Sequence, residues 1–322
     1  MKKLYKQAGV SIEENDYLIP RYRTISKTAT RPEVINEIGT FSGLFKLKKY
    51  TNPVLVASTD GVGTKVMLAK QYNTLDTIGH DIVNHCVNDI LTSGAEPLFF
   101  LDYLATNGLT KQQKLKIVQG IADACKKNNT ALLGGETADM NDLYPKGEFD
   151  LAGTIVGVVE KNSLIDTKSI KPRDSILALP SNGLHTNGYS LARKALPKRL
   201  NNKDRTLLGE PLKQALMRSH PSYLNDLKPH LAVIKGIAHI TGGGIEGNIK
   251  RILPKNTIAK IDKTTWSIPP IFQLIQKHGK VSDKEMFQVF NMGIGIAFIV
   301  NQRHRKQLMR KLPHCIEIGY IA

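Results

Sequence analysis

Short apolar runs that end at glycines or acidic residues recur along the chain, and they constrain its fold more than any other feature. Four of these runs lie in the first half, at residues 54–57, 98–101, 131–133 and 151–159. Their length is typical of buried strands. Because glycine lets the backbone turn sharply at a strand end, we expect a sheet whose functional groups lie in the loops that follow its strands.

Two longer segments of the first half have the periodicity of amphipathic helices. In the segment 76–94, Asp76 is suited to cap the helix and Gly94 to end it. Its apolar residues share one face, and they are Ile78, Ile82, Val83, Cys86, Val87, Ile90 and Leu91. The segment 112–129 repeats the pattern with Leu115, Val118, Ile121, Ala122 and Cys125 directed inward. The first half is therefore predicted to pack helices on a sheet.

The second half has a similar mixture of elements. Apolar runs at 175–179, 237–240, 286–290 and 294–300 predict strands, and residues 189–196 predict a helix. A polar stretch at 161–174 separates the halves. The sequence thus predicts an α/β protein of the α+β type with two mixed sheet-and-helix domains, expected at residues 1–166 and 167–322.

The composition fits two domains of ordinary size. The chain has 322 residues and is 41% hydrophobic. No apolar run approaches the ~20 residues of a membrane span, and the N-terminus lacks the apolar core of a secretory signal. The cysteines, Cys86, Cys125 and Cys315, include no CxxC pair and cannot build a disulfide framework. We therefore expect a cytoplasmic protein with no membrane partner.

The formal net charge of +17 is the main reason to consider nucleic-acid binding. The basic residues are scattered, however, with only small clusters at 46–49 and 303–311. No aromatic residues interleave with them, and the glycine loops carry acids. The charge is better explained as solvated surface and as attraction for phosphorylated small molecules, so nucleic acid is not an expected partner. A non-enzymatic basic binding protein, with salt-sensitive binding to RNA or DNA, remains one alternative.

The loop STDGVGTK, residues 58–65, combines an acid with two glycines and a lysine. A nucleotide-binding P-loop needs glycine, four residues and then glycine-lysine-serine/threonine. Here the order is Gly63-Thr64-Lys65, which does not match. Two alternatives follow: the loop is a plain surface connection, or it binds phosphate through a metal ion held by Asp60.

Three acids of the first half lie next to glycines or in polar loops. Asp60 lies in STDGVGTK, Asp89 follows Asn88 on the predicted helix, and Glu136 follows a glycine pair in LLGGETADM. Mg²⁺ in proteins takes one or two carboxylates and completes its shell with water and phosphate. These acids are therefore candidate Mg²⁺ ligands. The alternative is that Asp60 and Glu136 are turn residues and Asp89 belongs to a solvated helix face.

One face of the same helix carries Asp81, His85, Asn88 and Asp89. A transition-metal site at His85 and Asp89 is one interpretation. It is disfavoured because no second histidine or cysteine lies on this face of the helix. A polar helix face that reaches a site at Asp89 is the favoured interpretation.

Two loops of the second half carry further candidates. In SNGLHTNGYS, His185 and Asn187 lie just before a predicted helix. Three roles are open for His185: a general acid, a phosphate ligand, or a residue of a simple capping loop. The stretch 242–247 formally matches the dinucleotide fingerprint GxGxxG, with Asp262 twenty residues beyond Gly242. The helix that follows ends at Pro254 after barely two turns, which disfavours a nicotinamide enzyme.

Taken in order, the motifs resemble one family over nearly the whole chain. They are STDGVGTK, CVNDILTSGAEPLFFLDY, LLGGETADM, GTIVGVVEK, LALPSNGLHTNGYSLARK, AHITGGG and NMGIG, preceded by YKQAGV and RPEV. Together they are similar to the phosphoribosylformylglycinamidine cyclo-ligases, also called aminoimidazole ribonucleotide synthetases, of purine biosynthesis.

This resemblance implies a homodimer whose N-terminal domains pair their sheets, with a C-terminal domain that completes an active-site cleft. It also implies an ATP- and Mg²⁺-dependent ring closure on a ribonucleotide substrate. ATP phosphorylates the formyl-amide oxygen, an amidine-side nitrogen attacks the resulting iminophosphate carbon, and phosphate leaves. Phosphorylation turns a poor leaving group into a good one, and such transfers depend on positioning and charge neutralisation.

The resemblance also implies roles for individual residues. Asp60, Asp89 and Glu136 are expected metal ligands, with Asp89, His185 and Asn187 near the chemistry. The expected ATP-binding residues are Gly61, Gly63, Thr64, Lys65, Gly134, Gly135, Gly242, Gly243, Gly244 and Asn291.

Several positions depart from the family pattern. Residues 39–43 read GTFSG where the family has a stretch like GGFGG, and Gly247 stands directly before Asn248 where a glutamate is usual. His80 and His85 are also not part of the pattern. A related alternative is another ATP-dependent phosphoryl-transfer enzyme of the superfamily, such as a thiamine phosphate kinase. A selenophosphate synthetase is disfavoured because the first cysteine is Cys86.

Overall fold

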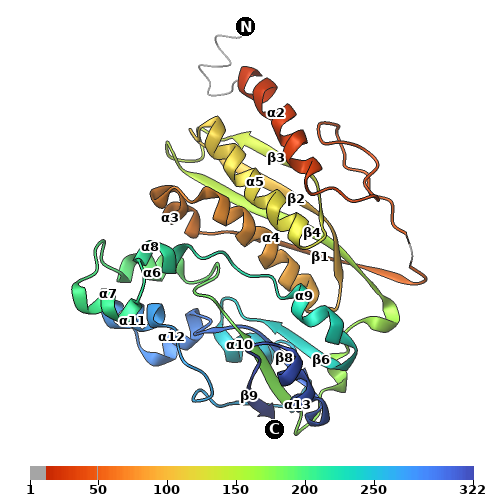
Figure 1. Cartoon of the computed structure of the whole chain (residues 1–322), viewed down its shortest axis with the longest axis vertical. Coiled ribbons are helices and arrows are strands. Elements are labelled where there is room, and N and C mark those ends of the chain that lie inside the picture. Colours follow the sequence, from red (N-terminus) through yellow and green to blue (C-terminus); the bar gives the residue numbers. More distant parts are fainter. Residues whose placement is uncertain (1–11, 49) are drawn as a thin grey trace. The chain divides into compact units, whose positions relative to one another are not determined.

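The computed structural model describes residues 12–48 and 50–322, so the motif YKQAGV at residues 5–10 lies outside the described residues (Figure 1). The chain divides into two compact units. The first comprises residues 1–90 and 96–161, and the second comprises 91–95 and 162–322. The sequence placed the division at residue 166. None of the described helices combines the length and the apolar character that crossing a bilayer requires.

The first unit is built on a four-stranded sheet. Its strands are β1 (Pro53–Gly61), β2 (Glu96–Thr106), β3 (Ala131–Asp139) and β4 (Phe149–Glu160). Their order is β1-β4-β2-β3, with β4 antiparallel to both β1 and β2 and with β3 parallel to β2. A parallel pair needs a crossover, and helix α5 supplies it between β2 and β3. The four strands predicted for this half are confirmed, each longer than its apolar run.

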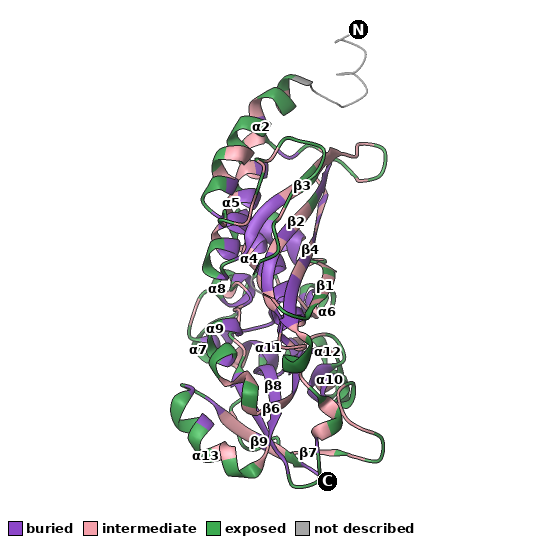
Figure 2. Cartoon of the chain, turned by 90° about the vertical axis from the view of Figure 1, so that its right-hand side faces the viewer, coloured by how far each residue is buried: buried purple, intermediate pink, exposed green. Residues whose placement is uncertain are grey.

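The described residues of this unit form four helices: α2 (Ile12–Lys27), α3 (Lys65–Tyr72), α4 (Leu75–Leu91) and α5 (Lys111–Lys127). Both predicted helices are confirmed. Helix α4 begins one residue before Asp76, which lies in its first turn rather than at its cap. A reciprocal capping box between Thr110 and Gln113 begins α5. Buried residues run through the sheet and α4 (Figure 2).

Two glycines allow α4 and α5 to pack very closely. A Cβ atom at Gly120 would lie 2.1 Å from the carbonyl oxygen of Asp76, and one at Gly79 would lie 2.4 Å from the amide nitrogen of Ile121. Side chains at these positions would therefore force the helices apart. The contact fixes α4 firmly over the sheet, and α4 carries several of the candidate site residues.

A fully buried ion pair joins α3 to α4. The Lys65 ammonium lies 2.7 Å from one carboxylate oxygen of Asp81 and donates a hydrogen bond of 2.9 Å to the other, and both side chains are 0% exposed. Burial lowers the pKa of Lys65, against the raising effect of the Asp81 charge. Two buried charges are tolerated only when they are paired, so the loop between β1 and α3 is fixed against α4.

The second unit contains a five-stranded sheet of order β6-β8-β5-β9-β7, in which every neighbouring pair is antiparallel. The strands are β5 (Ser175–Pro180), β6 (Ile234–His239), β7 (Ala259–Ile261), β8 (Ile294–Val300) and β9 (Ile316–Ile321). Strand β8 is buried along its whole length and forms the centre of the core.

Eight α-helices accompany this sheet in the described residues. They are α6 (Tyr189–Ala195), α7 (Asn202–Leu208), α8 (Leu212–Met217), α9 (Leu224–Leu227), α10 (Gly244–Lys250), α11 (Pro270–Gly279), α12 (Asp283–Val289) and α13 (Gln302–Lys311). The three short 3₁₀ segments are η1 (Lys161–Ser163), η2 (Thr167–Ser169) and η3 (Lys228–Val233). The mixed sheet-and-helix class predicted for both halves is confirmed.

One strand prediction was wrong. Residues 286–290 were expected to form a strand, but most of them belong to helix α12. Ser282 caps this helix by accepting a hydrogen bond from the Glu285 amide, and Asp283 and Glu285 place acids in its first turn. These start signals outweigh the short apolar run.

The GxGxxG stretch leads into the seven-residue α10 beside an antiparallel sheet, which is not the parallel βαβ unit of a dinucleotide site.

Replacing Lys65 with methionine should destabilise the protein. The change leaves the Asp81 carboxylate buried without its counter-charge, which costs about 3–5 kcal/mol in the free energy of unfolding. Urea denaturation of the purified variant measures this loss. The double variant Lys65→Met/Asp81→Leu should recover most of it, because neither charge then remains buried. A Lys65→Met protein as stable as the parent would contradict the structural role of the pair.

Candidate functional site

The end of β1 and one face of α4 bring three polar side chains together. The Nε2 atom of His85 lies 2.8 Å from Oδ2 of Asp60 and 3.8 Å from Oδ2 of Asp89. His85 and Asp89 are one helical turn apart on α4, so they share a face. Ser58, two residues before Asp60 on β1, donates a hydrogen bond of 2.9 Å to Oδ2 of Asp89. We call Asp60, His85 and Asp89 the α4 cluster.

His85 and the two aspartates of the α4 cluster favour one another's ionised forms, whereas the charge of Asp89 opposes ionisation of Asp60. Burial alone would lower the pKa of His85, but the hydrogen bond and the charge of Asp60 raise it, with help from Asp89. Burial likewise opposes ionisation of Asp60, yet the hydrogen bond and the charge of His85 hold the pKa of Asp60 below its ordinary value. The carboxylate form of Asp60 is thus favoured, which is the form that binds a cation.

The α4 cluster has the donor set of a divalent-cation site. One ligand atom from each side chain lies within 4.8 Å of the other two. The side chains of Asp60 and Asp89 are 40% and 28% exposed, whereas that of His85 is 5% exposed. A cation here would be held by protein on one side and open to water or phosphate on the other. The residues present therefore fit Mg²⁺, and the cluster contains two of the three predicted metal ligands.

The loop after Asp60 connects the α4 cluster to helix α3. The Gly61 amide donates to Oδ1 of Asp60 at 2.7 Å, which holds this carboxylate in place. Gly63 has φ +67°, in the left-handed region, and Thr64 directly precedes the first turn of α3. Backbone N–H groups at this helix start are suited to an anion.

The predicted phosphate contact of Lys65 requires a correction. The side chain of Lys65 is fully buried and paired with Asp81, so its ammonium is not available to a phosphate at the loop surface. The sequence pattern of glycines followed by lysine suggested a phosphate ligand. The physical reason for the different outcome is that Lys65 starts α3 on the side that faces α4.

Glu136 lies on β3, apart from the α4 cluster within one chain. Three strand spacings, roughly 14 Å at about 4.8 Å each, separate β3 from β1 in the sheet order. The register pairs Glu136 with Tyr103 and Tyr103 with Ala152, whereas Asp60 pairs with Gly153. Because strand side chains alternate, Glu136 is directed to the face opposite Asp60. The three predicted metal ligands are therefore not brought to one point by a single chain.

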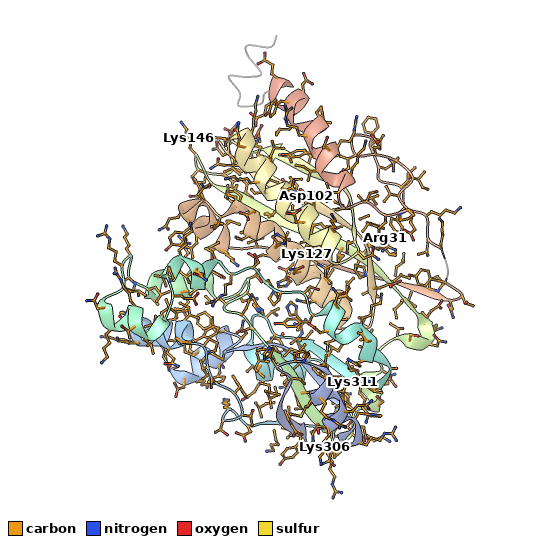
Figure 3. All side chains as sticks on the ribbon, in the orientation of Figure 1. Arg31, Asp102, Lys127, Lys146, Lys306 and Lys311 are labelled. Carbon is orange, nitrogen blue, oxygen red and sulfur yellow. The ribbon has the colours of Figure 1, made fainter. Side chains whose placement is uncertain are left out.

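Gly134, Gly135 and Glu136 instead line a cavity of about 1000 Å³ in the first unit. Its other walls include parts of α2, the segment 37–43 and strand β2. Asp102 on β2 is one of these lining residues and is labelled in Figure 3. A Cβ atom at Gly135 would lie 2.2 Å from Oδ1 of Asp102, so glycine is required there. Burial, with a smaller effect of Glu136, raises the pKa of Asp102 to about 7. Sequence reasoning missed Asp102, although an acid inside the apolar run LFFLDY is a usable signal.

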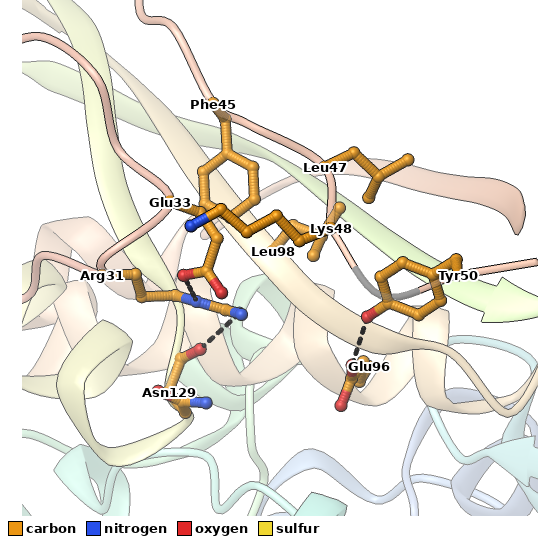
Figure 4. A pocket seen from close by; sticks show the side chains of 9 residues that line it. All are labelled: Arg31, Glu33, Phe45, Leu47, Lys48, Tyr50, Glu96, Leu98 and Asn129. Carbon is orange, nitrogen blue, oxygen red and sulfur yellow. Dashed lines mark hydrogen bonds and ion pairs between the residues drawn. The ribbon is translucent and has the colours of Figure 1, made fainter.

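A smaller cavity of about 250 Å³ lies beside the motif RPEV (Figure 4). Arg31 donates to the carbonyl oxygens of Pro97 and Asn129 at 2.9 and 3.0 Å and pairs with Glu33 at 3.3 Å. Tyr50 donates a hydrogen bond to Glu96 across the same cavity. Arg31 thus ties the segment before β1 to the starts of β2 and β3, which is a structural role for this motif.

In the second unit, His185 belongs to a group of three buried histidines. Its ring stacks on that of His220, with centroids 4.1 Å apart, and Nε2 of His220 lies 3.0 Å from Nε2 of His239. His185 itself has φ +61°. The NMGIG motif explains part of this arrangement, because a Cβ atom at Gly295 would lie 2.9 Å from the His185 ring. No motif in the sequence analysis pointed to His220.

The remaining predicted residues of the second unit organise its loops. Asn187 accepts a hydrogen bond of 3.1 Å from the amide of Gly242, which joins the histidine loop to the glycine loop. Gly243 and Gly244 have φ +98° and +68°. Asn291 is buried, accepts from Ser181 at 2.9 Å and donates to the carbonyl oxygen of Gly183 at 2.8 Å. Asn291 therefore braces the loop that leads to His185.

Two family models match the chain. Residues 43–159 match the N-terminal domain of the AIR synthase related proteins, and residues 171–322 match their C-terminal domain. The two matches agree with the two sheets of the structure.

Solved structures of lower identity share the fold over most of the chain. Thiamine-monophosphate kinase from Stenotrophomonas maltophilia covers 95% of this chain and 93% of its own, with a TM-score of 0.67 and 19% identity. The alignment with HypE of E. coli covers 95% of this chain and 90% of HypE, with a TM-score of 0.65 and 14% identity.

Curated relatives named phosphoribosylformylglycinamidine cyclo-ligase match at much higher identity. The one from Thermoanaerobacter sp. (strain X514) is 46% identical over 321 residues, covering 98% of this chain and 96% of its own. The one from Thermodesulfovibrio yellowstonii is 49% identical over 332 aligned residues, covering 100% of this chain and 95% of its own. Two domain matches, the shared fold and these near-complete alignments agree. The chain belongs to the AIR synthase related family and, within it, to the phosphoribosylformylglycinamidine cyclo-ligases.

Proposed function

We infer that this protein is an ATP-dependent phosphoribosylformylglycinamidine cyclo-ligase that closes the imidazole ring of formylglycinamidine ribonucleotide in purine biosynthesis. Its near-full-length identity to curated enzymes of that name carries the assignment. The three cysteines are buried free thiols, which fits an enzyme of the reducing cytoplasm. The products expected from this reaction are aminoimidazole ribonucleotide, ADP and phosphate.

The residues of the first unit are proposed to hold the nucleotide. Asp60 and Asp89 would bind Mg²⁺, which when bound neutralises phosphate charge. The amides of Gly63 and Thr64 at the start of α3 would contact phosphate, while the Gly61 amide orients Asp60. Gly134, Gly135 and Glu136 would contact the nucleotide through the cavity that they line. Lys65 has a supporting role, since its pair with Asp81 fixes this loop.

The residues of the second unit are proposed to serve the ribonucleotide and the ring closure. His185 would move a proton as the amidine-side nitrogen attacks, and Asn187 would orient reacting groups while it holds the Gly242 amide. In the reaction, phosphoryl transfer to the formyl-amide oxygen converts that oxygen into a leaving group. The nitrogen then forms a bond to the formyl carbon, the carbon–oxygen bond breaks, and phosphate departs. Gly243, Gly244 and Asn291 keep the loops around these groups in place.

A kinase acting on a phosphorylated small molecule is a second candidate. The fold shared with thiamine-monophosphate kinase favours it, but at 19% identity that likeness concerns the fold alone. The two functions differ in their acceptor, so a substrate panel separates them. Release of aminoimidazole ribonucleotide from formylglycinamidine ribonucleotide supports the cyclo-ligase, whereas phosphorylation of thiamine phosphate supports the kinase.

We further propose that the protein is a homodimer through the face of the first sheet that points away from α4. Leu55 on β1 is 62% exposed and Tyr103 on β2 is 39% exposed, and the strand register places both side chains on this face. An antiparallel sheet can have one face in contact with solvent, but the side chains on that face are then usually polar. Two copies that pair these faces would cover the apolar side chains.

Asp60→Asn should lower turnover at saturating ATP and Mg²⁺ by at least about a hundredfold. The reason is that a neutral amide is a weak ligand for a cation and does not hold the positive charge that neutralises phosphate. The fold should persist, since Asp60 is partly exposed. Coupled assay of ADP release measures turnover, and circular dichroism reports the fold. Asp142→Asn, an exposed aspartate of the same unit, is the matched control. Full activity of the Asp60→Asn enzyme would remove Asp60 from the metal site.

Leu55→Lys should convert the dimer into monomers, because the substitution places a charge in the middle of the proposed interface. Light scattering after size-exclusion chromatography measures the mass of each species. Ile258→Lys offers a control, since Ile258 is 60% exposed in the other unit. A parent protein that elutes as a monomer, or a Leu55→Lys variant that remains dimeric, would contradict this interface.

A further inference from the structure

We propose that His85 is a metal ligand and that it makes the cation site of this protein select a transition metal ion, such as Mn²⁺, Co²⁺ or Zn²⁺, over Mg²⁺. The inference rests on the proposed cation site at Asp60 and Asp89 and adds a nitrogen donor to it.

The first argument is geometric. Ligand atoms around one such ion, bound at about 2.0–2.2 Å, lie roughly 3–3.5 Å apart. Nε2 of His85 is 2.8 Å from Oδ2 of Asp60 and 3.8 Å from Oδ2 of Asp89, so its separations from the two oxygens bracket this range. All three donor atoms lie within 4.8 Å of one another. Shifts of a few tenths of an ångström would accommodate an ion among them.

The second argument concerns rigidity. His85 is only 4% exposed and lies in the middle of α4, whose position the close contact with α5 fixes. Asp89 follows one turn later and is held by Ser58. Asp60 is held by the Gly61 amide. The three donors are therefore preorganised by separate backbone contacts, so an ion would not have to assemble them.

The third argument is chemical. Mg²⁺ prefers an all-oxygen shell, whereas imidazole nitrogen suits Mn²⁺, Co²⁺ and Zn²⁺ increasingly well along the usual order of affinities. A site with two carboxylates and one imidazole thus keeps its affinity for hard cations and gains affinity for borderline ones. A metal ligand must be a neutral imidazole, so binding releases the Nε2 proton to solvent.

A purely structural role for His85 makes the opposite prediction. If the imidazole serves only as an internal counter-ion for Asp60 and Asp89, it competes with any metal ion for the same oxygens. Removing the ring would then strengthen the binding of every divalent cation. If His85 is a ligand, removing it weakens the binding of transition metals and leaves Mg²⁺ binding almost unchanged. The sign of one change in affinity separates the two roles.

The experiment titrates the full-length protein with Co²⁺ alone and with Mg²⁺ alone, without nucleotide, by isothermal calorimetry. Visible absorption of bound Co²⁺ reports whether a nitrogen ligand is present. The variants are His85→Leu and His85→Gln, the latter keeping a polar side chain in case the former folds poorly. His80→Leu, a histidine on the same helix outside the α4 cluster, is the matched control. Circular dichroism confirms that each variant is folded.

We expect both His85 variants to bind Co²⁺ at least about tenfold more weakly, with a changed Co²⁺ spectrum, while Mg²⁺ affinity changes less than about twofold. Unchanged or tighter Co²⁺ binding in the two variants would overturn the proposal. Turnover assays on the same preparations keep it separate from the proposed function. Active protein with His85-independent Co²⁺ binding refutes only the metal selectivity, and inactive protein with His85-dependent binding refutes only the cyclo-ligase assignment.

Discussion

The buried pair of Lys65 and Asp81 is the interaction on which the arrangement of the first unit depends. Burying two charges is costly, and the cost is offset only when both partners keep their positions. Lys65 begins the helix after the glycine loop, and Asp81 lies one turn before His85 on α4. Fixing one to the other therefore sets the distance from the end of β1 to the polar face of α4, which is the distance that brings Asp60 to His85.

Much of the fold could be predicted from the sequence because its signals are local. The strands of the first unit are apolar runs of ordinary length, and α4 and α5 have apolar faces and clear ends. The prediction failed at residues 286–290, where a short apolar run lies inside a helix. There the capping by Ser282 and the acids that follow it decided the structure. A run of five residues is too short for periodicity to distinguish a strand from a helix.

The site could be predicted only in part because its geometry depends on register and packing. Asp60 and Asp89 were both predicted, and they meet through His85. Glu136 was predicted with them, but strand alternation and three strand spacings keep it apart within one chain. Lys65 was predicted to face phosphate, yet the direction of its side chain follows from how α3 packs on α4. Residue types identify ligands, but only the sheet order and the helix contacts determine which of them converge.

The carboxyl group of Asp102 lies against Gly135 of the neighbouring strand, and it makes the stability of the β2–β3 pair depend on pH. Burial raises its pKa to about 7, far above the value that an aspartate has in an unfolded chain. In acid, both the folded and the unfolded forms carry the proton, and the burial costs nothing electrostatic. As the pH rises from about 4 to about 7, the unfolded form is ionised while the folded form still keeps its proton, so the free energy of unfolding decreases. Above about pH 7 both forms are ionised and this loss is complete, so the contribution of Asp102, which lines the cavity of about 1000 Å³ in the first unit, changes between acid pH and neutrality.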